Sequence, residues 1–440
     1  MRRQGKRTGT WSFALPMFLY FFLVITIFWI LKPLKSALFL EFYDATGFTL
    51  GSWRLKAAQA ELLAKILNLV VALLAAAVFA RLAGRLRREQ LTYVFSAFFV
   101  ACFLGLAALL EAPGDGAVWS FYLLGDLFTT LMVTTFFAFL NDSVSPEQAK
   151  RLYGPVVLGG VLGGALGPTF LRLYIERFSA PFWLLAATAG VIVVAALAGL
   201  AGAYVRRHPP PERRAPVSAA TSDRVDIGGV VRLLLRSRYL LAVVLMVGLY
   251  EIASQVLDFQ FKAAVTHFLD GPDIGRHMTS IYALSNWTAL FVQLVLTRWV
   301  MTHLGVRWAL LFLPGAISLG SAGFLVFPIL WTGSLLNTAD SGFAYSINQS
   351  AKEALYVPLS RGEKYQAKAF IDMFVQRFGK VLAIGISLAL TTWFTSFSAV
   401  RWLSLFTLAV AAVWVATASY AGRRFEEYAA ELDRESSEAA

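Results

Sequence analysis

The chain has 440 residues, of which 58% are hydrophobic and only 15% are charged. With a positive mean hydropathy as well, this composition excludes an ordinary soluble globule and indicates a membrane protein. The formal net charge of +12 does not indicate nucleic-acid binding, because the basic residues fall in short loops between apolar runs, where they set orientation.

The cysteine and histidine content argues against an internal disulfide and against a metal site. The single cysteine, Cys102, allows no disulfide within the chain, and the four histidines are scattered without metal-ligand spacing. We therefore expect no metal and no cofactor. The first apolar run, from Trp11, is long and lacks a small-residue cleavage site, so we expect a retained membrane helix rather than a signal peptide.

About twelve membrane-spanning helices of roughly 20 or more residues each are predicted. The tenth is polar enough that hydropathy alone would miss it. We expect an all-α polytopic membrane protein with two six-helix halves, of the major-facilitator type. The predicted spans are 12–40, 55–80, 89–110, 117–140, 150–175, 181–205, 239–267, 277–300, 306–328, 332–357, 366–393 and 398–421.

Lysine and arginine gather on one side of the predicted membrane, in the amino terminus, several alternate loops and one long link. The positive-inside rule then places both termini in the cytoplasm of a cell (inner) membrane. Acidic-then-basic turns follow helices four and ten, so the two halves echo each other. The expected organisation is a first half at 1–205, a basic and proline-rich link at 206–238, a second half at 239–421 and a charged tail at 422–440.

Charged residues inside the first and fourth spans are the first candidate site residues. Burying a charge in hydrocarbon costs roughly 2.5–3.5 kcal/mol even on a lenient scale, so such residues usually face a bundle interior or a watery path. Lys32 and Lys35 lie one turn apart, and Lys32 precedes Pro33, where the helix can kink. Snorkelling to the headgroups is the alternative for both lysines. Asp126 lies near mid-depth and cannot snorkel.

The fifth span contains glycines at three- and four-residue spacing, at 159, 160, 163, 164 and 167. This is not a nucleotide cradle, because no strand precedes it and the chain has no phosphate-loop motif. Small residues at this spacing instead predict a close helix-packing seam or pivot. Without a phosphate loop we expect no ATP hydrolysis, and we expect a solute carrier rather than an enzyme.

The second half supplies a further set of charges within spans. Glu251, Asp258 and Lys262 fall within about 40° on one helical stripe, at 100° per residue, and a local Asp258–Lys262 pair is the structural alternative. In the eleventh span, three polar residues recur every four positions. Lys352 in the tenth span is a weaker candidate, for which an inter-helix salt bridge is equally plausible. The eleventh-span residues are Asp372, Gln376 and Lys380.

Together these charges predict one cavity shared by both halves. Lysine is a compact point charge suited to phosphate or carboxylate. The aspartates would keep the lysines charged and could bind a cation, a proton or a ribose hydroxyl. The residue types therefore indicate an anionic, phosphate-bearing substrate.

Several motifs resemble the non-mitochondrial ATP/ADP translocases of plastids and obligate intracellular bacteria. The resemblance spans nearly the whole chain, and its most specific part lies around helices ten and eleven. The matching motifs are KEALYVPL at 352–359, KAFID at 368–372, RFGK at 377–380, LKPLK at 31–35, GDLF at 125–128, ND at 141–142, AKRLY at 149–153 and LDFQFK at 257–262.

This resemblance implies a twelve-helix, major-facilitator-like nucleotide transporter. It implies exchange of ATP for ADP with phosphate, although some members carry other nucleotides or use protons. Two lysines and two acids within the membrane are needed in that family, and by motif they correspond to Lys35, Lys380, Asp126 and Asp258. The partners implied are nucleotide or another phosphate-bearing anion and the lipid bilayer, with proton or phosphate coupling left open.

The chain departs from the family pattern at several positions. Both acids are aspartates where the family has glutamates, which changes the space available to a substrate. Val381 and Leu382 replace a glycine-rich continuation, and Ala351 stands where cysteine is frequent. Two alternatives therefore stay open: a carrier of another organic anion or lipid headgroup, and a membrane scaffold without transport activity.

Overall fold

The computed structural model describes residues 2–51, 53–144, 146–207, 236–356, 370–393 and 396–438, with a few residues between these ranges (232, 234, 358–359 and 367–368). The chain divides into two compact units. The first comprises Met1–Ala219 with Asp270–Ala283, and the second comprises Ala220–Leu269 with Leu284–Ala440.

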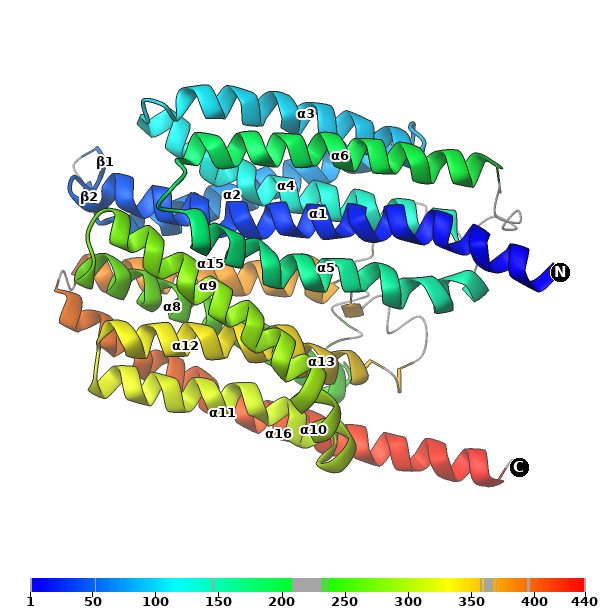
Figure 1. Cartoon of the computed structure of the whole chain (residues 1–440). Helices are drawn as coiled ribbons and strands as arrows, with labels where there is room; N and C mark the ends of the chain where they lie inside the picture. The colour runs from blue at the N-terminus through cyan, green and yellow to red at the C-terminus, as the bar shows by residue number, and fades with distance from the viewer. Residues whose placement is uncertain are drawn as a thin grey trace. The chain divides into compact units, whose positions relative to one another are not determined.

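The first unit contains six long helices, which run alongside one another in Figure 1, and the first part of α9 (Pro272–Phe291). A short antiparallel hairpin, not predicted from the sequence, joins the first two, with Phe48 opposite Leu55. The elements are α1 Arg2–Asp44, β1 Phe48–Leu50, β2 Trp53–Leu55, α2 Ala57–Ala83, α3 Arg88–Leu109, α4 Asp115–Ser143, α5 Pro146–Tyr174 and α6 Ala180–Arg207.

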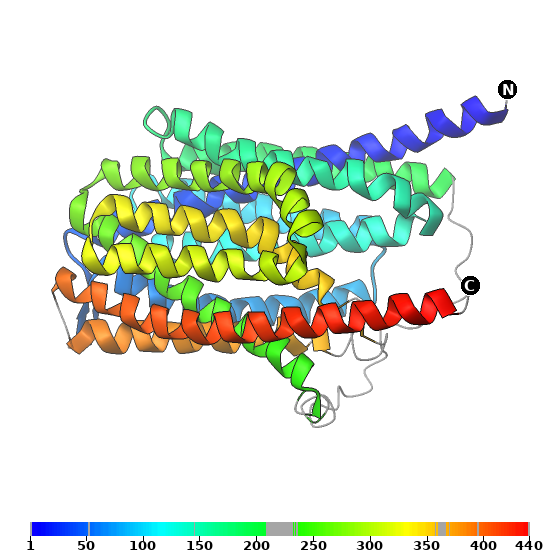
Figure 2. The same cartoon turned by 90° about the horizontal axis from the view of Figure 1, so that it is seen from below.

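The second unit has more interrupted helices. Figure 2 shows its last element, α16, as one long helix in orange to red that ends at the C-terminus. The division between units falls within α9. The elements are α8 Arg238–Phe268, α9 Pro272–Phe291, η1 Val292–Thr297, α10 Arg298–His303, α11 Gly305–Val326, α12 Leu330–Phe343, η2 Ala344–Asn348, α13 Gln349–Ala354, η3 Ile371–Val375, α15 Gln376–Trp393, η4 Phe397–Trp402 and α16 Leu403–Glu438.

Within the described residues, ten helices are long and apolar enough to cross a membrane. The prediction of an all-helical polytopic membrane protein is confirmed. Two of the twelve predicted spans fall outside this set, at residues 330–354 and 371–393. Both are helical but contain π-helical turns, η2 and η3. Such turns are rare in proteins as a whole, and those that occur often lie at functional sites.

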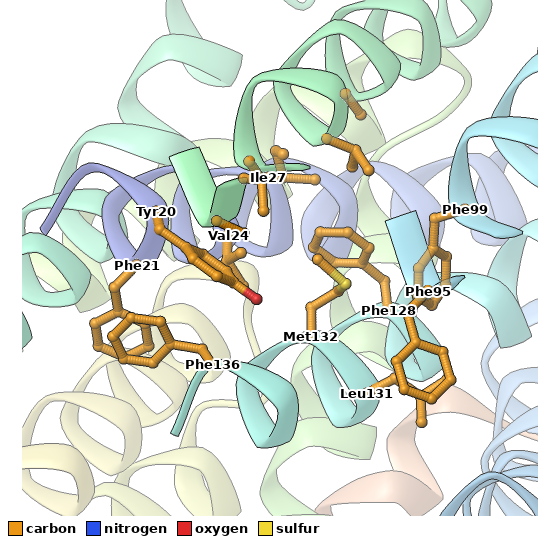
Figure 3. Packing of buried hydrophobic residues seen from close by; sticks show 14 of the residues in the cluster. Tyr20, Phe21, Val24, Ile27, Phe95, Phe99, Phe128, Leu131, Met132 and Phe136 are labelled. Carbon is orange, nitrogen blue, oxygen red and sulfur yellow. The ribbon is translucent and has the colours of Figure 1, made fainter. Parts of the chain in front are cut away.

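Aromatic side chains dominate the core of the first unit. Phe21 of α1 stacks on Phe136 of α4 with ring centroids 4.3 Å apart, and Tyr20 meets Phe136 edge-on at 5.1 Å, as Figure 3 shows. Tyr20 also shares a 3.1 Å hydrogen bond with Thr92 of α3. Lipid tails are as apolar as leucine, so membrane helices associate through such close packing and occasional polar contacts.

The glycine stripe of α5 packs against α1, which confirms the predicted seam. A Cβ added at Gly163 would lie 2.5 Å from the carbonyl oxygen of Phe22, and one at Gly167 would lie 2.8 Å from that of Thr26. Contacts this short are not tolerated, so only glycine lets the two backbones approach this closely.

We expect Gly163→Ala to lower the melting temperature, because the added methyl meets backbone that cannot move aside. Overpacking of this kind costs about 1–3 kcal/mol. Gly105→Ala in α3 is the matched control, since a Cβ there meets nothing within 4 Å. Thermal unfolding of the purified variants checks the difference, and equal melting temperatures would refute the seam.

Candidate functional site

Lys35 lies deep within the first unit. Its side chain is 3% exposed, and its Nζ is 2.5 Å from Oδ2 of Asp126. The ammonium also donates to the carbonyl oxygen of Tyr122 at 3.3 Å and lies 4.2 Å from the centroid of the Tyr122 ring. The snorkelling alternative is therefore wrong for Lys35, which turns into the protein toward α4.

Asp126 is the more open member of this pair, with 39% of its side chain exposed. Its Oδ2 also accepts a hydrogen bond from Asn68 of α2. Gly125 makes room for the lysine stem, because a Cβ there would lie 2.9 Å from Cδ of Lys35. Because this carboxylate is partly exposed, an incoming anion can reach the pair and replace Asp126 as the partner of Lys35.

A buried carboxylate that sequence reasoning missed supports this pair. Glu61 of α2 is buried and accepts hydrogen bonds from Ser36 at 2.9 Å and from the hydroxyl of Tyr122 at 3.0 Å. Through Tyr122 it holds the ring and carbonyl that Lys35 contacts. The available signal was an acidic residue inside the apolar second span.

In the second unit Lys380 of α15 pairs with Glu251 of α8. Its Nζ lies 3.6 Å from Oε2 of Glu251, and 46% of the lysine side chain is exposed while Glu251 is buried. Gly379 sets this register, because a Cβ there would lie 3.1 Å from both the Glu251 Cβ and the Gly248 carbonyl oxygen. The pair is loose, and its lysine is the exposed member.

Asp258 pairs locally instead. Its Oδ2 lies 3.0 Å from Nζ of Lys262, one helical turn away, and both side chains are largely buried. The neighbour pairing considered as an alternative is confirmed. Glu251, which the sequence placed among secondary candidates, is thus the acid that contacts Lys380.

The tenth predicted span contributes two residues that were not singled out. Asp340 of α12 is 6% exposed and accepts a 2.7 Å hydrogen bond from Ser254. Tyr345, in the π-helical turn η2, is 59% exposed. It interacts electrostatically with four charged side chains of this unit, which are Lys380, Asp340, Glu251 and Asp258. An open aromatic ring beside a charged cluster can stack on a planar ligand.

The remaining candidates have different surroundings. Lys32 is half-buried against aromatic rings, with Nζ 4.5 Å from the Trp29 ring and 5.6 Å from that of Tyr282. Lys352 and Gln376 are half-buried on α13 and α15. The side chain of Asp372 lies outside the described residues.

A salt bridge forms at Glu353, the residue next to Lys352. Glu353 pairs with Lys368 at 2.8 Å, and both side chains are about equally exposed. The ion-pair alternative considered for this segment is therefore realised by the neighbouring residue.

Comparison with known families supports the architecture. The family model described as Major Facilitator Superfamily matches residues 17–356, and that of the TLC ATP/ADP transporter matches residues 326–425. In structure, the chain is similar to the nucleoside transporter NupG, with a TM-score of 0.59 and 15% identity over 93% of this chain and 98% of that one. The predicted major-facilitator-like fold is confirmed.

Curated relatives extend the comparison to sequence. The chain is 24% identical over 384 residues to ADP,ATP carrier protein 1 of Chlamydia muridarum, covering 77% of this chain and 70% of that protein. It is 22% identical over 400 residues to ADP,ATP carrier protein 5 of Rickettsia prowazekii, covering 74% and 80%. The predicted resemblance to ATP/ADP translocases is confirmed.

Apolar spans with paired charges inside them define a multi-pass helical membrane protein of the kind that carries solutes. The chain belongs to the Major Facilitator Superfamily.

Proposed function

We propose that this chain is a secondary active transporter of nucleotides that works by alternating access. The observation that carries the proposal is the lysine–carboxylate pair inside the spans of each unit, Lys35 with Asp126 and Lys380 with Glu251. The names of the curated relatives, which are ADP,ATP carriers, support nucleotide as the substrate class.

The proposed binding residues are Lys35, Asp126, Asp258 and Lys380. Phosphate oxygens accept charge-assisted hydrogen bonds just as carboxylates do, so a nucleotide phosphate can displace Asp126 from Lys35, and likewise Glu251 from Lys380. When no nucleotide is bound, Asp126 and Glu251 pair with the two lysines, so neither ammonium group is left without a partner inside the membrane. That all four proposed residues serve one bound nucleotide remains a prediction.

Transport by purified protein in liposomes tests this function. Liposomes preloaded with ADP should take up labelled ATP, and empty liposomes should not if exchange is obligatory. Uptake into empty liposomes only under a proton gradient would indicate proton coupling instead. Absence of nucleotide uptake under every condition would refute the proposal.

A carrier of another organic anion is the second candidate. The observation that favours it is the shorter acid at positions 126 and 258, together with Val381 and Leu382 beside Lys380. A panel of unlabelled anions competing with labelled ATP separates the two candidates, because a different native substrate should compete more strongly than ADP.

We further propose that both termini lie in the cytoplasm, with the protein in the cell (inner) membrane. The excess of lysine and arginine in the termini and the link supports this orientation. Because Cys102 is the only cysteine, a Cys102→Ser background carrying Gly114→Cys offers a single label. A membrane-impermeant maleimide should label it in intact cells, whereas Arg236→Cys should react only after lysis.

Tyr345 is proposed to stack on the nucleotide base. Its ring is open beside the charged cluster of the second unit, and base–aromatic stacking contributes about 1–3 kcal/mol per base. We therefore expect Tyr345→Ala to raise KM for ATP about 5- to 100-fold, and Tyr345→Phe to stay near wild type. Initial uptake rates over a range of ATP concentrations check this, with Trp331→Ala on α12 as the exposed aromatic control. A Tyr345→Ala variant with unchanged KM would exclude stacking.

A further inference from the structure

A groove on the first unit has no charged residue in its lining. It has a volume of about 350 Å³ and is formed by α2, α3 and α4. Every side chain that lines it is hydrophobic. The lining residues are Val71, Leu74, Ala75, Val78, Leu82, Val94, Phe95, Phe98, Leu127 and Leu131.

The groove has a buried floor and exposed walls. Phe95 and Leu131, both labelled in Figure 3, are buried, whereas Leu74, Val78 and Phe98 are exposed. All three helices are long and apolar enough to span a membrane. From Val71 to Leu82 the groove follows α2 for about 16 Å, at 1.5 Å per residue. Its shape and lining suit an extended alkyl chain.

Three exposed arginines stand at one end of this groove. Arg81 directly precedes the lining residue Leu82 at the end of α2, and Arg85 and Arg87 follow in the short connection to α3. No hydrogen bond or ion pair joins these three side chains to the described residues. Their neighbours differ: Arg88 pairs with Asp142 at 2.5 Å, and Glu89 pairs with Arg206 at 2.5 Å.

We propose that this groove binds one acyl chain of an anionic phospholipid, whose phosphate is held by Arg81, Arg85 and Arg87. The apolar lining takes the chain, and the arginines complement the charge of the headgroup where the span meets the membrane surface. A nucleotide does not suit this groove, because no polar side chain lines it. The proposed ligand is thus a lipid and not the transported nucleotide.

Native mass spectrometry of the purified, delipidated full chain tests the proposal. Phosphatidylglycerol and phosphatidylcholine with identical acyl chains are added separately, and the retained lipid is measured. We expect wild type to retain phosphatidylglycerol preferentially. The variant Arg81→Ala/Arg85→Ala/Arg87→Ala should lose that preference, by about fivefold for each arginine removed.

Two further variants keep the test falsifiable. Arg207→Ala/Arg232→Ala/Arg236→Ala removes the same charge from exposed arginines elsewhere and should keep the preference. Ala75→Phe fills the groove without changing charge and should reduce retention of both lipids. Equal retention of the two lipids by wild type, an equal loss in the control triple variant, or unchanged binding by Ala75→Phe would each overturn the proposal.

Discussion

Replacing Lys35 with alanine is expected to lower labelled ATP uptake by ADP-loaded liposomes on the order of 100-fold. Hydrogen bonds to a charged group contribute about 1.5–3 kcal/mol, and Lys35 is proposed to make such bonds to phosphate. Lys35 is the cation that pairs with Asp126, so its loss removes that charged donor from the site. Uptake by Lys56→Ala, which removes an exposed lysine before α2, should remain at the wild-type level.

A double variant separates transport from folding at this pair. Lys35→Ala alone removes a buried side chain and leaves the Asp126 carboxylate without its ion-pair partner, so the melting temperature of this variant should fall. Lys35→Ala/Asp126→Ala removes both charges and should recover most of that stability while remaining inactive. Uptake by Lys35→Ala at the wild-type rate, or restored uptake in the double variant, would contradict the assignment.

Opposite effects on nucleotide affinity are expected from the two members of the Lys380–Glu251 pair. Lys380 lies 3.6 Å from Glu251 and is partly exposed, so it can turn to a phosphate at little cost. Lys380→Ala should therefore raise KM for ATP about 10- to 100-fold, as expected for the loss of a charged hydrogen-bond donor. Glu251→Gln removes the competing carboxylate and should lower KM.

The same uptake assay over a range of ATP concentrations checks both variants. Arg424→Ala is a suitable control, because Arg424 also pairs with a glutamate, Glu427 at 2.7 Å, but on the exposed end of α16. Its KM should not change. If Glu251→Gln raised KM as much as Lys380→Ala does, the two residues would act as one structural unit and the competition mechanism would be wrong.

Much of the fold follows from local sequence. Apolar runs of sufficient length predict membrane helices whatever their neighbours, and the glycine spacing of α5 predicts a close helix contact. The short β1–β2 hairpin was not predicted, because its two strands have only three residues each. The tenth span was marked as polar, and its polar character explains why Asp340 and Tyr345 did not stand out there as site residues.

The candidate site was only partly predictable. Lys35, Asp126 and Lys380 are conspicuous because a charge within an apolar span is costly wherever the helix lies. The partner of Lys380 was not predictable in this way. Glu251 and Asp258 share one stripe of α8, so periodicity cannot choose between them. The close approach of Gly379 to Gly248 makes the choice, because it brings Lys380 level with Glu251.

The amino-acid sequence by itself determined the membrane class, the helices and the presence of charges within them, because each depends on the cost of placing a residue in hydrocarbon. Only the tertiary structure decided which charges meet. Lys35 and Asp126 are 91 positions apart, and their 2.5 Å contact depends on the depth and rotation of two packed helices. Those are set by side-chain packing across the helix interface, such as the space left by Gly125.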